Sequence, residues 1–178
     1  MRKSVVIFAS KYGSTREVAE AVGEGLGADV FAVAEEVEWP RYGLVVLGAP
    51  LYSGRYLRGM ELFVQRHREV LRGMKVAAFV TAAADLEVQE GLTGEVDEAV
   101  YSSQDYAQGL GRMSGGEVVA YQGFGGRMLP GQLDAADRGT LEWFYRYLVR
   151  KPLEGFDLID LDAARRWGDS LRRFLSTT

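Results

Sequence analysis

Residues 4–27 read SVVIFASKYGSTREVAEAVGEGLG and predict a strand, a loop and a helix in succession. Residues 4–9 are almost continuously apolar, which is typical of a strand that is covered on both faces. Residues 16–26 follow the helical period, with apolar side chains on one side and glutamates on the other. Gly27 supplies a stop for this helix. A buried strand that leads straight into an amphipathic helix is the repeating unit of a parallel α/β sheet.

The rest of the chain repeats this unit. Further strands are predicted at 29–33, 44–49, 76–81 and 117–122, and further helices at 57–71, 101–113 and 161–175. Ser102 and Asp105 have the spacing of a capping box, and Asp160 is placed to cap the last helix. The fold class is therefore predicted as α/β: a three-layer, doubly wound, five-stranded parallel sheet in the order 2-1-3-4-5.

One connection in this fold is unusually long. Residues 123–159 separate the last strand from the last helix, whereas such a connection ordinarily has about 2–6 residues. We interpret residues 1–178 as a single domain with an insertion at 123–159, within which 140–151 is predicted to be helical.

Composition excludes several classes of protein and site. With 47% hydrophobic and 26% charged residues, the chain is not disordered as a whole. It has no cysteine and a single histidine, His67, which excludes disulfides, thiolate or histidine-rich metal sites and a cysteine nucleophile. His67 itself is interpreted as a solvated helix residue. A net charge of −4 argues against nucleic-acid binding. Redox chemistry would therefore need an organic cofactor.

The loop after the first strand is the strongest candidate site. It consists of Ser10, Lys11, Tyr12, Gly13, Ser14 and Thr15. At the carboxyl edge of the sheet, free N–H groups of a helix N-terminus, hydroxyl donors and a glycine turn suit a phosphate. The P-loop motif G-x-x-x-x-G-K-[ST] is absent, and no G-x-G-x-x-G dinucleotide fingerprint follows the first strand. Gly23, Gly25 and Gly27 come at the helix end and are interpreted as its fraying and stop. A plain helix cap is the alternative interpretation of the loop.

Two more loops follow strands at the same edge. Their candidate residues are Pro50, Leu51, Tyr52, Ser53 and Gly54 in one, and Thr81, Ala82, Ala83, Ala84 and Asp85 in the other. An aromatic turn and a run of small residues beside a phosphate site suit a flat ring tethered to a phosphate. Flavin mononucleotide (FMN) fits this arrangement better than a nucleoside triphosphate. Tyr52 either stacks on the ring or fills the turn.

The chain resembles the flavodoxin superfamily over nearly its full length. Ser10 to Thr15 have its hydroxyl–x–x–Gly–x–Thr phosphate-loop pattern, and the resemblance implies that main-chain groups of the other two loops contact the isoalloxazine edge. Within the superfamily it looks most similar to the branch containing menaquinone-dependent protoporphyrinogen oxidase. Residues 45–49, 61–64 and the insertion carry this likeness, while the acidic stretch 85–98 departs from it.

This resemblance implies an FMN-dependent oxidoreductase that passes electrons from a reduced small-molecule donor to a quinone-type acceptor. No catalytic acid or base is identified. Two alternatives remain: a one-electron carrier between protein partners, and a flavin-free interaction domain. A cytoplasmic location is expected, because the apolar run near the N-terminus is too short for a signal peptide or a membrane span.

The predicted helix 140–151 combines aromatic and basic residues. Residues 138–151 contain four basic side chains and one acidic one, in contrast to the net charge of −4 for the whole chain. Two interpretations are open. The aromatics pack on the protein's own sheet, or residues Thr140 to Lys151 contact a quinone, a partner or the inner face of a membrane.

Overall fold

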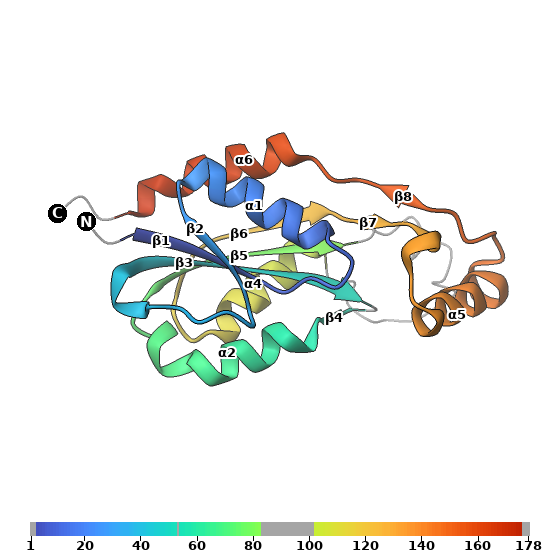
Figure 1. The fold of residues 1–178 in the computed structure, drawn as a ribbon, viewed down its shortest axis with the longest axis horizontal. Helices are drawn as coiled ribbons and strands as arrows, with labels where there is room; N and C mark the ends of the chain where they lie inside the picture. The colour runs from blue at the N-terminus through green and yellow to red at the C-terminus, as the bar shows by residue number, and fades with distance from the viewer. Residues whose placement is uncertain (1–2, 53, 83–101, 176–178) are drawn as a thin grey trace.

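A parallel sheet forms the centre of the computed structural model, which describes residues 3–52, 54–82 and 102–175 (Figure 1). The long strands run in the order β2-β1-β3-β5-β6, and all neighbouring pairs among them are parallel. Their bounds are β1 Lys3–Phe8, β2 Asp29–Ala32, β3 Tyr42–Tyr52, β5 Lys75–Ala82 and β6 Glu117–Gly125. Since β4 (Arg55–Tyr56) only folds back antiparallel on the end of β3, the predicted order 2-1-3-4-5 is confirmed.

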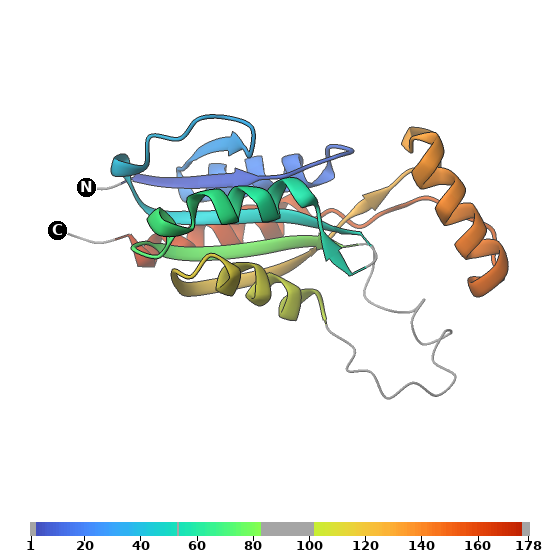
Figure 2. The same ribbon diagram turned by 90° about the horizontal axis from the view of Figure 1, so that it is seen from below.

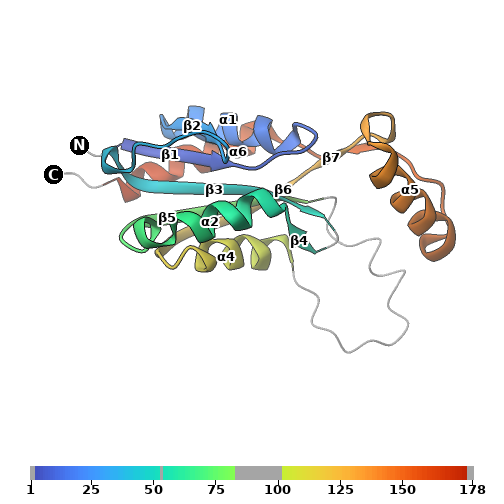
Figure 3. The ribbon, with the colours of Figure 1, turned by 60° about the horizontal axis from the view of Figure 1, so that its bottom comes forward.

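Helices cover both faces of this sheet (Figure 3). One face carries α1 (Ser14–Leu26) and α6 (Leu161–Ser170), which continues as the 3₁₀ turn η4 (Leu171–Phe174). The other carries α2 (Arg58–Leu71) and α4 (Ser103–Met113), and a short 3₁₀ turn, η1 (Trp39–Arg41), precedes β3. Successive strand residues face opposite layers, so Val5 and Ile7 pack under α2 and α4 while Val6 and Phe8 pack under α1 and α6. This two-sided burial explains the continuous apolar runs in the sequence.

The residues predicted to cap or end helices do so in the structure. The side chain of Asp160 accepts a hydrogen bond from the backbone N–H of Ala163 at 2.8 Å at the start of α6. Ser102 and Asp105 form a reciprocal capping box on α4. Gly27 ends α1 in the left-handed conformation, with φ of 72°.

The interpretation of Gly25 as a fraying residue is wrong. A Cβ on Gly25 would lie 2.1 Å from the carbonyl oxygen of Arg165, and one on Gly168 would lie 2.2 Å from that of Val22. Both glycines therefore let α1 and α6 pack with their backbones in contact. The sequence could not show this, because the partner helix is about 140 residues away in the chain.

The insertion lies beyond the carboxyl ends of the strands (Figure 2). It contains β7 (Arg127–Met128), η2 (Pro130–Gln132), α5 (Ala135–Phe144), a π-helical turn η3 (Tyr145–Val149) and β8 (Phe156–Asp157), which pairs antiparallel with β7. Strand β6 runs to Gly125, past the predicted end at 122. The helix begins earlier than predicted because the side chain of Asp134 caps it by accepting from the N–H of Asp137 at 2.8 Å.

The helix of the insertion does not pack on the sheet. Neither α5 nor η3 contains a buried residue. The interpretation that its aromatics pack on the protein's own sheet is therefore wrong. In the described ranges, no helix combines the length and the apolar character needed to cross a bilayer.

Candidate functional site

The loop from Ser10 to Thr15 presents the N-terminus of α1 at the carboxyl edge of the sheet. Gly13 adopts φ of 95°, a left-handed conformation that favours glycine, and its N–H donates to the Ser10 hydroxyl oxygen at 3.1 Å. Gly13, the N-cap residue of α1, has no side chain to accept from the first N–H groups of the helix. A Cβ on Gly13 would meet nothing within 4 Å, so open space lies next to these donors. This geometry suits an anion.

Thr15 has a different position from the other loop residues. It is buried, and its hydroxyl lies 2.8 Å from the hydroxyl of Thr81 at the end of β5. The candidate phosphate loop and a candidate ring loop are therefore linked directly, by residues far apart in the sequence. The hydroxyl of Thr15, predicted as a phosphate donor, is therefore buried at this junction with Thr81.

Lys11 and Tyr12 bind the insertion. The ammonium of Lys11 lies 2.8 Å from a carboxylate oxygen of Asp134 and 2.7 Å from one of Asp137. The phenol of Tyr12 also donates to Asp137, and accepts from the backbone N–H of Asp134 at 3.3 Å. We call these four residues the latch. The charge of Lys11 is therefore balanced by carboxylates and is not free for a phosphate.

Hydrogen bonds within the latch shift the pKa values of its members. The pKa of Asp134 falls to about 2, first because the N–H of Asp137 donates to it and then because Lys11 does. The pKa of Asp137 is lowered by hydrogen bonds from Lys11 and Tyr12. The pKa of Lys11 is raised by the same carboxylates. At neutral pH the ammonium of Lys11 and the carboxylates of Asp134 and Asp137 are therefore charged, while the phenol of Tyr12, whose pKa is raised, keeps its proton.

A second polar cluster holds the base of the insertion. The guanidinium of Arg127 on β7 donates to both carboxylate oxygens of Glu17 on α1, with a shortest distance of 2.7 Å, and to Asp157 on β8 at 2.8 Å. Such a two-pronged arginine–carboxylate pair defines orientation as well as distance. The hydrogen bonds that Arg127 donates to Glu17 and Asp157 raise the pKa of its guanidinium.

Between the sheet edge and the insertion lies a cavity of about 340 Å³. From the predicted site it gathers Lys11, Tyr12, Ser14, Pro50, Leu51, Tyr52, Thr81 and Ala82. From the insertion it gathers Gly126, Arg127, Met128, Leu129, Gln132, Leu133, Asp137, Thr140, Leu141, Tyr145 and Phe156. The insertion residues were missed as site residues, although their position directly after a strand that ends at this edge was a usable signal.

The two tyrosines of the turn after β3 have different positions. Tyr52 is 40% exposed and lines the cavity, where loss of water around its phenol raises its pKa to about 12. Tyr56 donates instead to the backbone oxygen of Tyr106 at 2.7 Å and meets its ring edge-on. Gly54, with φ of 72°, forms the turn between them. Of these two tyrosines, Tyr52 is therefore the one placed to face a ring in the cavity.

Several predicted residues lie elsewhere. Ser10 and Gly13 line a second hollow of about 490 Å³, which Lys11 and Arg16 also line. Ser53, Ala83, Ala84, Asp85 and the acidic stretch 85–98 lie outside the described residues.

His67 does not line the cavity; it lies on α2, as predicted, but is half-buried rather than fully solvated. Its ring packs against Trp39 and Phe63, with centroids 5.1 and 4.5 Å away, and burial lowers its pKa.

Comparisons with known proteins show the family and the fold of this chain. A family model described as a flavodoxin domain matches residues 5–149. Protoporphyrinogen IX dehydrogenase [quinone] of Escherichia coli K12 is 33% identical over 84 residues, which are 43% of this chain and 46% of that protein. The chain thus spans about half the length of the curated relatives it matches.

Solved structures share the fold at low sequence identity. Oxidised flavodoxin 1 from Bacillus cereus superposes with a TM-score of 0.59 at 17% identity, covering 98% of this chain and 99% of that one. A WrbA-like flavodoxin from Agrobacterium tumefaciens superposes with a TM-score of 0.56 at 18% identity, covering 98% and 97%. With the family model matching most of the chain, the protein belongs to the flavodoxin domain family.

Proposed function

We propose that this protein binds FMN and acts as an oxidoreductase that passes electrons from a reduced small-molecule donor to a quinone-type acceptor. The observation that carries the proposal is the joint geometry of two features. The uncapped N-terminus of α1 provides anion donors, and the 340 Å³ cavity that begins at the same loop has mainly apolar and aromatic walls. An anion site next to a largely apolar cavity suits the phosphate and the ring of a flavin.

The residues present fit such a cofactor. Ser14 and the first N–H groups of α1 would hold the phosphate, with Gly13 allowing close approach. Pro50, Leu51 and Tyr52 would line one side of the ring, and insertion side chains would line the other. Cavities of this volume and polarity are typical of cofactor sites.

Bound FMN would supply the electron chemistry, and the chain's own residues would bind it, orient it and limit its contact with water. The donor loses two electrons and two protons, and a quinone gains both to become a quinol. Among the described residues that line the cavity, none is a histidine, and the one aspartate, Asp137, is paired with Lys11. We therefore infer that the protein contributes position rather than a strong general base.

The insertion supports a small-molecule donor over a protein partner. Thr140, Leu141 and Tyr145 of the insertion helix line the cavity from outside the sheet, where a one-electron carrier would need an open flavin edge. The donor class is proposed from the Escherichia coli relative, whose name specifies protoporphyrinogen IX and a quinone.

The first test is a titration of the purified protein with FMN, followed by flavin fluorescence. We expect saturable binding at micromolar concentrations or tighter. Ser14→Glu should weaken binding at least about tenfold, because it places a carboxylate among the phosphate donors. Gln65→Glu on the exposed surface of α2 adds the same charge elsewhere and should leave binding unchanged. Absence of FMN binding at micromolar concentrations would refute the proposal.

A second test separates the enzyme from the carrier. With FMN bound, turnover of a soluble quinone by a reduced tetrapyrrole donor supports the enzyme. Rapid electron exchange with a redox protein, without quinone turnover, supports the one-electron carrier and overturns the proposed acceptor.

A further inference from the structure

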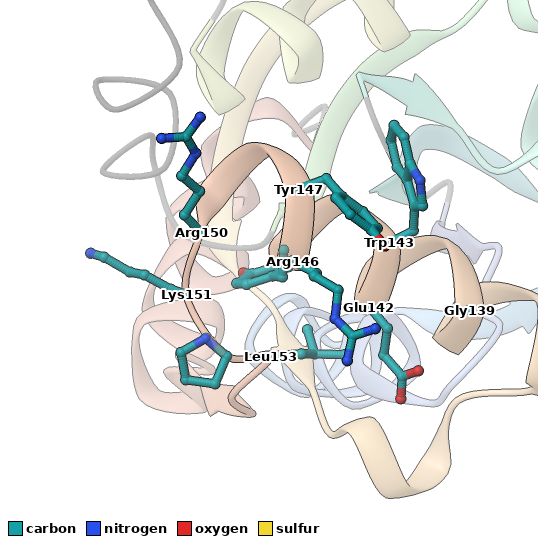
Figure 4. Close-up of a pocket in the computed structure, with 10 residues that line it drawn as sticks. Gly139, Glu142, Trp143, Arg146, Tyr147, Arg150, Lys151 and Leu153 are labelled. Carbon is teal, nitrogen blue, oxygen red and sulfur yellow. The ribbon is translucent and has the colours of Figure 1, made fainter.

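One face of the insertion helix has no partner in the described part of the chain. Trp143 is 57% exposed, Tyr147 58% and Leu148 46%, in a protein where most aromatic side chains are at least partly buried. Arg146, Arg150 and Lys151 lie on the same segment. We call the surface formed by Trp143, Arg146, Tyr147, Arg150 and Lys151 the outer face, and a hollow of about 680 Å³ lies over it (Figure 4).

The aromatic side chains of the outer face stand together. The ring centroids of Trp143 and Tyr147 are 5.8 Å apart, and Figure 4 shows the two side chains next to each other on the helix. The π-helical turn Tyr145–Val149 and a left-handed Arg150, with φ of 58°, end the helix just beyond them. Exposed aromatics grouped in this way typically mark an interaction surface.

The cations of the outer face form no ion pair with a carboxylate of the described residues. Among residues 3–52, 54–82 and 102–175, no carboxylate lies within 4 Å of Arg146, Arg150 or Lys151. Elsewhere, exposed arginines such as Arg41 and Arg165 do have carboxylate partners. Only Glu142 adds an acidic side chain to the residues that line the hollow. The outer face is therefore a local positive surface on a chain of net charge −4.

We propose that the outer face docks on an anionic lipid bilayer. Trp143 and Tyr147 lie at the level of the headgroups, and Arg146, Arg150 and Lys151 contact lipid phosphates, an arrangement typical of interfacial helices. A second copy of the chain is a poorer partner, because a two-fold contact through this face would oppose like charges. The helix is short, so binding is reversible and weakens as salt rises.

This docking would place the candidate cofactor site near the bilayer. Thr140, Leu141 and Tyr145 line the 340 Å³ cavity, while Tyr145 also borders the hollow over the outer face. A single helix therefore separates the two spaces. Lipid binding through the outer face does not require bound FMN.

The test is cosedimentation of the full chain, with and without added FMN, with vesicles of phosphatidylcholine or of phosphatidylcholine mixed with phosphatidylglycerol. We expect binding to the anionic vesicles that falls with salt. Arg150→Glu/Lys151→Glu should reduce partitioning at least about tenfold. Arg66→Glu/Arg68→Glu on the exposed side of α2 makes the same change in net charge and should have little effect.

Trp143→Ser tests the aromatic contribution. It should reduce partitioning severalfold and remove the blue shift of tryptophan fluorescence that vesicles produce in the unmodified chain. Equal binding to neutral and anionic vesicles, or equal loss in both charge variants, would overturn the proposal. So would a dimer that Arg150→Glu/Lys151→Glu disrupts while vesicles are not bound. Because lipid binding is read without turnover, its failure leaves the FMN titration unaffected.

Discussion

Helices α1 and α5 lie on either side of the candidate cofactor cavity, and they relate to the protein in opposite ways. Helix α1 buries Val18, Val22 and Leu26 and meets α6 backbone to backbone through glycines. Helix α5 buries no residue and is attached through the latch at its N-terminus. Burial of apolar surface stabilises the first, and exposed charged contacts orient the second.

Because of this difference, we expect α1 to determine the stability of the domain and α5 to determine access to the site. Changes in the α1–α6 contact should reduce the free energy of unfolding of the whole domain. Changes in the latch should alter the insertion and leave the sheet intact. The cavity needs both, because its anion donors come from α1 and its outer wall comes from α5.

The largest effect is expected for Gly168→Ala. Its Cβ would lie 2.2 Å from the backbone oxygen of Val22, and backbone cannot move aside as a flexible side chain can. We expect the free energy of unfolding to fall by about 2–3 kcal/mol, measured by chemical denaturation. Gly139→Ala in α5 is the matched control, because a Cβ there meets nothing within 4 Å. It should leave stability unchanged or raise it by about 0.5–1 kcal/mol. A large loss in the control would contradict the contrast between the two helices.

A smaller and more local effect is expected when the latch is broken. Lys11→Met removes the cation that Asp134 and Asp137 share. Hydrogen exchange of residues 133–157 should become severalfold faster, while the free energy of unfolding changes by less than about 1 kcal/mol because these charges are exposed. Arg41→Met, which breaks an exposed pair with Glu38, should not affect exchange in the insertion. Unchanged exchange in Lys11→Met would show that the latch does not hold the insertion.

The smallest effect concerns pH. The pKa of Asp134 is lowered to about 2 and that of Asp137 is also lowered, so both lie below the unfolded value near 4. Their contribution is therefore complete above about pH 4 and is lost as the pH falls toward 2. Fluorescence anisotropy of Trp143, measured against Trp143→Phe, should fall over this window. In Asp137→Asn the anisotropy should fall less over the same pH range. If this variant and the unmodified protein had identical pH profiles, the latch would not be the cause of the fall.

Much of the fold could be predicted because its signals are local. Continuous apolar runs identified the long strands, and Ser102, Asp160 and Gly27 marked helix ends by chemistry that acts within one turn. Strands β7 and β8 are two residues each, too short for any period to appear. The role of Gly168 depends on a helix that the local sequence does not contain.

Only the part of the candidate site that lies at the edge of the sheet could be predicted from the sequence. Three loops at the carboxyl edge follow from strand order, so Ser14, Leu51 and Thr81 were expected near one another, and the structure brings them together with the insertion. Their roles toward a cofactor remain predictions. The insertion half was missed because the contacts that place it, such as Lys11 with Asp137, join residues more than a hundred positions apart.

The sequence by itself determined the layers, the strand order and the loop that offers anion donors, since each follows from short-range periodicity or capping. The tertiary structure alone decided which side of the insertion helix faces the cavity and which remains exposed. The aromatic and basic residues of 140–151 are compatible with a buried helix or an exposed one. Only the position of α5 beyond the sheet edge, held by charged contacts, leaves Trp143 and Tyr147 without neighbours from the sheet.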